Sequence, residues 1–211
     1  GLGAAFPAVT LTAYHLLRSA YRLRRGESVL VHAIGGAVGL MLTQLASEMG
    51  ARVIGTVGSA AKAKRALEFG AERVVARGRE DFVAAVKEAT GGAGVDVVLD
   101  MVGGDYIARD LEILAPEGRL VFIAFLGGSK AEVNFLPVMM KRLTVTGSTL
   151  RPRPVAFKAA IARSLEEKVW PLLAAGRVKP VIHRTFPLAE AAQAHALMES
   201  STHVGKIVLT V

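Results

Sequence analysis

The 211-residue sequence contains no cysteine. These residues therefore form no disulfide bond, offer no thiolate to a metal ion and supply no cysteine nucleophile. Redox chemistry here would need a borrowed cofactor, because cofactors carry the electron and hydride chemistry that side chains lack. The absence of cysteine also suits a reducing compartment, and we expect a cytoplasmic protein.

The sequence also lacks a long apolar run. No stretch approaches the roughly 18 to 20 residues needed to cross a bilayer, and no secretion signal opens the chain. We therefore expect a soluble protein with no membrane partner. Hydrophobic residues nevertheless make up 52% of the sequence, which is enough to bury a substantial core.

Aromatic residues are scarce, at 6%, although the formal net charge is +8. The cations are scattered in ones and twos, and aromatic residues do not interleave with them as a stacking platform for bases requires. This distribution disfavours nucleic acid as the main partner. A phosphorylated small molecule fits the excess of positive charge better.

Apolar runs alternate with helix-like stretches along most of the chain. Strands are expected at 28–33, 51–57, 72–76, 95–102, 118–125 and 143–150. Helices are expected at 38–50, 59–70, 80–90, 104–114 and 136–142. Strands this apolar on both faces belong to a parallel sheet covered by helices on both sides. The fold class predicted is α/β, a Rossmann-type doubly wound sheet, with its sixth strand at the edge.

We divide the chain into residues 1–150, the Rossmann domain with a leading helix, and residues 151–211, a helix and strand tail. The Pro-rich segment at 151–154 marks the boundary, since proline breaks helix and strand alike. A long helix is expected from about Pro154 to Ala174, another over 188–200, and a closing strand over 205–211. Whether the tail packs on the first body or on a partner domain stays open.

The segment "HAIGGAVG" joins the first strand to the first helix of this pattern. Such a turn presents free backbone N–H groups with a helix dipole behind them, which is an anion site. Small residues run from Ala33 through Gly36 to Gly39 and leave room for a diphosphate to touch the backbone. The alternative, that these glycines serve tight packing alone, stays open at this point.

The end of the second strand bears on the choice of cofactor. An NAD-binding protein usually places Asp or Glu there, but residues 51–58 contain no acid. Instead Gly58, Ser59 and Lys62 follow, and a hydroxyl with an ammonium suits a dianionic 2′-phosphate. We therefore predict NADP(H). The competing interpretation is that Ser59 only caps a helix and Lys62 is a solvated lysine.

Several motifs in order carry a resemblance to a known family. They are "GESVLVHAIGGAVGL", "GTVGSAAKAKRALEFGA", "GVDVVLDMVGGDY", "FIAFLGG", "TVTGSTLRPR" and "HVGKIVL". Together they resemble the zinc-independent quinone oxidoreductases of the medium-chain dehydrogenase/reductase superfamily, over essentially the whole chain. The resemblance implies an NADPH-dependent reductase acting on quinones or other electron-poor alkenes and carbonyls.

The resemblance also implies a GroES-like catalytic domain ahead of this region, with the active site in the cleft between the two domains. The sequence begins where that domain would be finishing, so we expect half of the cleft to lie outside these 211 residues. The cofactor contacts that the resemblance implies, together with the turn glycine, are Thr12, Gly36, Ala37, Val38, Gly58, Ser59, Lys62, Val102, Phe125 and Leu126.

Two positions depart from the family pattern. Ala37 stands where glycine is usual, and its methyl group would crowd a diphosphate or tilt the helix, which concerns affinity more than fold. Arg77 stands where many relatives have tyrosine, and its guanidinium fork would hold the 2′-phosphate in place of a phenol.

No metal site is predicted, because the zinc-ligand segment of other branches falls near Pro7 to Thr10, which offers no Cys or His. His32 is interpreted as a packed or hydrogen-bonded histidine. No catalytic proton donor is assigned. Asp96, Asp100 and Asp105 lie near the fourth strand but have no visible acid or base partner.

Two alternatives of function stay open beside the quinone reductase. One is the enoyl reductase module of a larger synthase, and the other is a non-catalytic module that binds NADPH or RNA. The edge strand near 143–148 invites pairing with a second copy of the chain, and relatives dimerise in this way, so we expect a homodimer.

Overall fold

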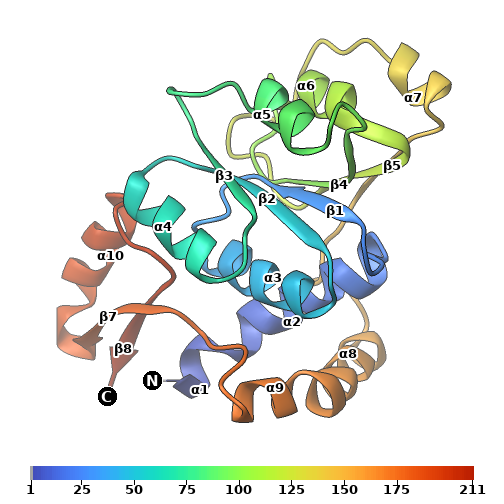
Figure 1. Ribbon diagram of the computed structural model, residues 1–211. Coiled ribbons are helices and arrows are strands. Elements are labelled where there is room, and N and C mark those ends of the chain that lie inside the picture. Colours follow the sequence, from blue (N-terminus) through green and yellow to red (C-terminus); the bar gives the residue numbers. More distant parts are fainter. Residues whose placement is uncertain (1) are drawn as a thin grey trace.

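The computed structural model describes residues 2–211 and contains a central six-stranded sheet (Figure 1). Its strands are β1 (Ser28–Val31), β2 (Arg52–Val57), β3 (Arg73–Ala76), β4 (Val95–Asp100), β5 (Leu114–Phe122) and β6 (Thr144–Gly147). The order in the sheet is β3-β2-β1-β4-β5-β6, and every neighbouring pair is parallel. The predicted Rossmann-type doubly wound sheet is confirmed, with β6 at the edge.

Helices connect these strands and continue into the tail. They are α1 (Leu2–Ala5), α2 (Pro7–His15), the π-helix η1 (Leu16–Ala20), α3 (Ala37–Glu48), α4 (Ala60–Glu68), α5 (Phe82–Ala89), α6 (Tyr106–Ile113), α7 (Leu136–Met140), α8 (Val155–Lys168), α9 (Trp170–Ala174), the 3₁₀ helix η2 (Leu188–Glu190) and α10 (Ala191–Glu199). None of the helices that the structure describes is long and apolar enough to span a membrane.

The sheet is buried on both faces, as its apolar strands require. Alternate residues of one strand enter different cores: Val29 and Val31 of β1 pack with α2, α3 and α8, whereas Leu30 packs with α5 and α6. These two helix layers lie on opposite faces of the sheet (Figure 1). The carboxyl ends of the strands therefore stay free of helices that cross them, and the connecting turns form that edge.

Two predicted elements differ most from the structure in their extent. The single helix expected over 154–174 is broken at Val169 into α8 and α9, because Pro171 has no N–H to continue the hydrogen-bond ladder. Strand β5 begins at Leu114 rather than 118 and ends at Phe122 rather than 125. Pro116 and Gly118 lie inside this strand and mask it in the sequence.

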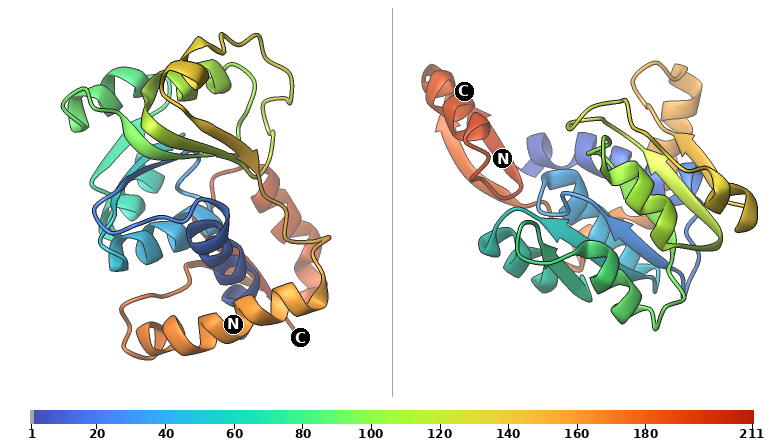
Figure 2. Two further views of the ribbon diagram at one scale, coloured as in Figure 1. Left: turned by 90° about the vertical axis from the view of Figure 1, so that its right-hand side faces the viewer. Right: turned by 90° about the horizontal axis from the view of Figure 1, so that it is seen from above.

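The tail packs on the first body through α8. Ile161 and Leu165 of this helix are buried in the main core, and the hydroxyl groups of Tyr14 and Ser164 lie 2.7 Å apart. Its last elements, β7 (Ile182–Pro187) and β8 (Lys206–Thr210), form a separate parallel pair beside α10. In Figure 2 this unit stands at one side of the main sheet. A parallel bridge between Gly36 and Gly205 connects it to the turn after β1.

Candidate functional site

The turn after β1 opens on a residue with an unusual backbone. Ala33 has a φ of 53°, in the left-handed region that only glycine adopts without cost. Gly36 then precedes α3, and no side chain caps this helix. Because the first amide groups of a helix have no partner within it, the uncapped start of α3 can receive an anion.

Gly39 fixes how closely α3 approaches the strand. A Cβ atom at this position would lie 2.5 Å from the carbonyl oxygen of Ile34 and 2.7 Å from its Cα. Real Cβ atoms do not approach backbone so closely, so any side chain here would push the helix away. Gly39 therefore serves packing, whereas Gly36 leaves the start of the helix without a side-chain cap.

A cationic cluster forms where β2 and β3 end. A Cβ atom on Gly58 would lie 3.1 Å from Nη2 of Arg77, so this guanidinium borders the turn after β2. The backbone N–H of Arg77 donates to the Val57 carbonyl across 2.8 Å. Ser59 caps α4, since its Oγ accepts the Lys62 amide at 3.4 Å. The structure brings these predicted residues together beside the glycine turn.

Lys62 extends from this cluster toward the tail. Its side chain covers Gly35, where an added Cβ would lie 2.6 Å from the Lys62 Cβ, and its Nζ donates to the Ser201 carbonyl at 2.6 Å. An ammonium has three N–H donors, so this contact leaves others for a phosphate. Burial, followed by the nearby Lys62 charge, lowers the pKa of His203. Lys62 is thus a partly buried residue that connects α4 to the tail.

A second group lies at the ends of β4 and β5. The Gly127 amide donates to the Val102 carbonyl at 2.7 Å, and the Leu126 amide donates to the Met101 carbonyl at 3.1 Å. These bonds place Val102 beside the exposed side chains of Phe125 and Leu126. The two loops form one apolar margin on the same edge of the sheet as the cationic cluster.

Three further predicted residues lie on the flanking helices. Ala37 and Val38 are half-buried at the start of α3 and pack against the main core. Thr12 lies on α2, where its hydroxyl donates to the Ala8 carbonyl at 2.9 Å. No hydrogen bond recorded among residues 2–211 joins Thr12 to the other predicted contacts.

Asp100 and Ser201 shape the site, and sequence reasoning did not assign them to it. The buried Asp100 carboxylate accepts the amides of Val102 at 2.6 Å and Gly103 at 3.0 Å, which organises the loop after β4. Its position at a strand end was a signal for such capping. Ser201 acts through its backbone carbonyl, which every residue has, so the sequence could not identify this position.

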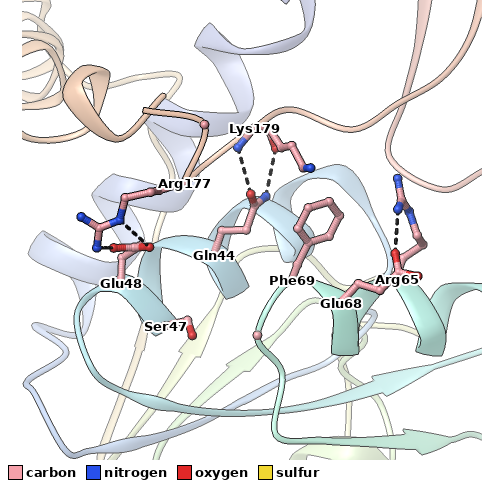
Figure 3. Close-up of a pocket in the computed structure, with 10 residues that line it drawn as sticks. Gln44, Ser47, Glu48, Arg65, Glu68, Phe69, Arg177 and Lys179 are labelled. Carbon is pink, nitrogen blue, oxygen red and sulfur yellow. Dashed lines mark hydrogen bonds and ion pairs between the residues drawn. The ribbon is translucent and has the colours of Figure 1, made fainter. Parts of the chain in front are cut away.

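A separate groove of about 360 Å³ lies at the other ends of α3 and α4 (Figure 3). Its polar groups satisfy one another: Gln44 donates to the Lys179 carbonyl and accepts the Lys179 amide, and Arg177 pairs with Glu48. Figure 3 shows these contacts joining α3 to the segment after α9. This groove is a joint between body and tail, away from the predicted residues.

The strand order, the uncapped glycine turn and the cations after β2 and β3 define a Rossmann-type α/β domain whose first turn has the geometry of an anion site. A family profile described as zinc-binding dehydrogenase matches residues 37–166. The chain belongs to this family, and quinone oxidoreductases are among the relatives that it resembles.

Two reductases and a synthase illustrate the similarity. Quinone oxidoreductase 1 of Escherichia coli is 37% identical over 202 residues, which cover 94% of this chain and 61% of the relative. A 2-haloacrylate reductase of a Burkholderia species is 33% identical over 203 residues, which cover 94% of this chain and 60% of the relative. A highly reducing polyketide synthase of Cordyceps militaris is 33% identical over 98% of this chain but 8% of the synthase.

Solved structures give the same result. Escherichia coli quinone oxidoreductase complexed with NADPH superposes with a TM-score of 0.86 at 36% identity, covering 98% of this chain and 64% of that protein. The chain thus spans about three fifths of the length of the curated reductases it matches. Although the family description names zinc, residues 2–211 contain no group of three or more potential metal ligands. The described residues do not fit a zinc ion.

Proposed function

We propose that this chain is the cofactor-binding part of an NADPH-dependent reductase that transfers hydride to quinones or other activated alkenes and carbonyls. The observation that carries the proposal is the pair of cations Lys62 and Arg77, together with the Ser59 hydroxyl, beside the uncapped start of α3. A dinucleotide with a third phosphate needs both features at adjacent strand ends, where the diphosphate and the 2′-phosphate bind.

In this proposal each part of the chain has a separate task. The amides at the start of α3 hold the diphosphate, and the cations hold the 2′-phosphate. Val102, Phe125 and Leu126 orient the nicotinamide and exclude water from one wall of the cleft. The bound cofactor supplies the hydride. The second wall of the cleft belongs to a further domain. Zinc takes no part in the reaction. We place the protein in the cytoplasm.

Replacing Lys62 with methionine is expected to weaken NADPH binding by about 10- to 100-fold, because charge-assisted bonds to phosphate contribute about 1.5–3 kcal/mol. NADH, which lacks the 2′-phosphate, is expected to change by less than about twofold. Fluorescence titration of both nucleotides measures this difference. Lys64→Met, two residues further along α4, is the matched control. An equal loss for both nucleotides would assign Lys62 to the Ser201 contact alone.

Assays of substrate class separate the two enzymatic alternatives. In a protein that carries both walls of the cleft, we expect oxidation of NADPH with a quinone and no oxidation with an α,β-unsaturated acyl thioester. The similarity to a polyketide synthase over nearly the whole chain favours the enoyl reductase module as the second candidate. Turnover of the thioester at a higher rate than the quinone would establish that candidate instead.

We further propose a homodimer through β6. This strand pairs with β5 on one side, its Val145 is 43% exposed, and the neighbouring helix α7 carries exposed apolar side chains, Leu136, Met139 and Met140. An open apolar strand edge is a ready template for a second copy.

Val145→Lys is expected to raise the dissociation constant of this dimer at least about tenfold, since it puts like charges at the two-fold contact. Light scattering at micromolar concentration measures the mass. Leu67→Lys, at an exposed leucine on α4, is expected to leave the mass unchanged. A monomeric parent protein would contradict the dimer.

A further inference from the structure

A chain of buried polar groups lies directly beneath the glycine turn. His32 follows β1, Thr56 belongs to β2 and Asp110 belongs to α6, and all three residues are fully buried. The His32 Nδ1 lies 3.1 Å from the Thr56 hydroxyl, and its Nε2 lies 2.7 Å from Asp110 Oδ1. The Thr56 hydroxyl also accepts the Ala33 amide at 3.3 Å. The chain thus begins at the first amide of the turn.

Chemistry fixes which group donates and which accepts in each of these hydrogen bonds. Because an ionised carboxylate can only accept hydrogen bonds, the Nε2 of His32 carries the proton and donates a hydrogen bond to Asp110. In the neutral ring Nδ1 then accepts the hydroxyl proton of Thr56, whose oxygen accepts the Ala33 amide. A doubly protonated ring would leave the Thr56 proton without an acceptor among the described residues.

The aromatic surroundings fix the ring of His32. Phe82 and Tyr106 meet it edge-on, with ring centroids 5.0 and 4.8 Å away. The second carboxylate oxygen of Asp110, Oδ2, is buried and has no hydrogen-bond partner among residues 2–211. A buried pair with an unsatisfied oxygen costs free energy, so stability alone does not account for it.

The hydrogen bonds of Thr56 and His32 hold the strained backbone of Ala33 in place. Thr56 holds the turn twice, since its hydroxyl accepts the Ala33 amide and its carbonyl accepts the Ile34 amide at 3.0 Å. The Ala33 carbonyl in turn accepts the Gly36 amide at 3.1 Å. A left-handed alanine persists only where its surroundings over-determine it, and such residues cluster at binding sites.

We propose that Thr56 and His32 are positioning residues for the diphosphate of the cofactor. They hold Ala33 in its left-handed conformation and thereby aim the first amides of α3, those of Ala37 and Val38, toward the diphosphate, while Asp110 fixes the tautomer of His32. This inference rests on the proposed function, because it assigns a task within the same nucleotide site. None of the three side chains touches the cofactor in this arrangement.

The test compares two nucleotides in calorimetric titrations of the intact protein. Thr56→Val keeps the shape of the side chain but removes the hydroxyl. We expect about a tenfold loss of affinity for 2′-phospho-ADP-ribose, which carries the diphosphate, and less than a twofold loss for adenosine 2′-monophosphate, which does not. Thr56→Ser restores the hydroxyl and is expected to bind both nucleotides as the parent does.

Thr10→Val is the matched control, since Thr10 is also fully buried but donates to the Phe6 carbonyl within α2. It is expected to change neither affinity. An unchanged affinity of Thr56→Val for 2′-phospho-ADP-ribose, or an equal loss for both nucleotides, overturns the positioning role and leaves the proposed function intact. A parent protein that binds neither nucleotide overturns both.

The protonation site of the His32 ring can be measured on the parent protein, so this test does not depend on whether a variant folds. Nitrogen-15 NMR of the His32 ring at pH 7.5 is expected to show a neutral ring with its proton on Nε2. A proton on Nδ1 would reverse the chain of donors and overturn the proposal, whatever the affinities of the variants.

Discussion

Gly39→Ala is expected to lower the free energy of unfolding by about 3 kcal/mol, at the upper end of the cost of overpacking, and to abolish measurable NADPH binding. The added methyl would lie 2.5 Å from the Ile34 carbonyl oxygen. Since the neighbouring atoms are backbone, they cannot rotate away as a flexible side chain would. Helix α3 must move outward, and its first amides move with it. Urea unfolding and nucleotide titration measure the two losses.

Gly36→Ala provides the control for stability. A Cβ there meets no atom closer than the Ala33 carbonyl oxygen at 3.6 Å, and the φ of −76° suits alanine. We expect its unfolding free energy to stay within about 1 kcal/mol of the parent value. Equal stability of Gly39→Ala and Gly36→Ala would contradict the close approach of α3 to the turn.

Asp110→Asn is expected to change how stability depends on pH. Burial raises the pKa of the Asp110 carboxyl from 3.8 to about 6, against the opposing hydrogen bond from His32. The folded protein therefore holds this proton more tightly than the unfolded chain. The stability that this contributes is fully present below pH 3.8 and is lost as the pH rises through about 6. At about 1.4 kcal/mol per unit, the loss is of the order of 3 kcal/mol.

The expected result is a gain for Asp110→Asn over the parent that grows by about this amount between pH 4 and pH 8. Unfolding in urea across this range measures the difference. The groups that face Asp110 are His32 on its hydrogen-bonded side, Asp100 at the end of β4 and Arg109 on its own helix. Asp105→Asn is the matched control, because Asp105 is exposed and lies directly before α6. It is expected to show no such trend. A constant difference would contradict the raised pKa.

The sheet could be predicted because its strands are apolar on both faces. Runs such as 28–33 and 95–102 are apolar at consecutive positions, and the structure uses consecutive residues for two different cores. The errors came where one residue opposed its context. Pro171 lies early in α9 and ends the longer helix, whereas Pro116 lies within β5 without ending it. Proline chemistry is the same in both, so tertiary pairing decides the outcome.

The site could be predicted only as far as residue type reveals chemistry. Ser59, Lys62 and Arg77 come together as their positions after parallel strands require. The contact of Lys62 with a carbonyl of the tail could not be foreseen, because it joins segments far apart in sequence through backbone. The pair of His32 and Asp110 was likewise hidden, since which helix residue faces a strand end depends on packing. The cofactor contacts themselves stay predictions until a nucleotide is titrated.

The bridge between Gly36 and Gly205 has a consequence for biosynthesis. During translation Gly36 is made well before Gly205, so this contact cannot form until the tail has emerged from the ribosome. The nascent sheet therefore exists for a time with the turn after β1 open on this side, and a product truncated before Gly205 lacks the contact.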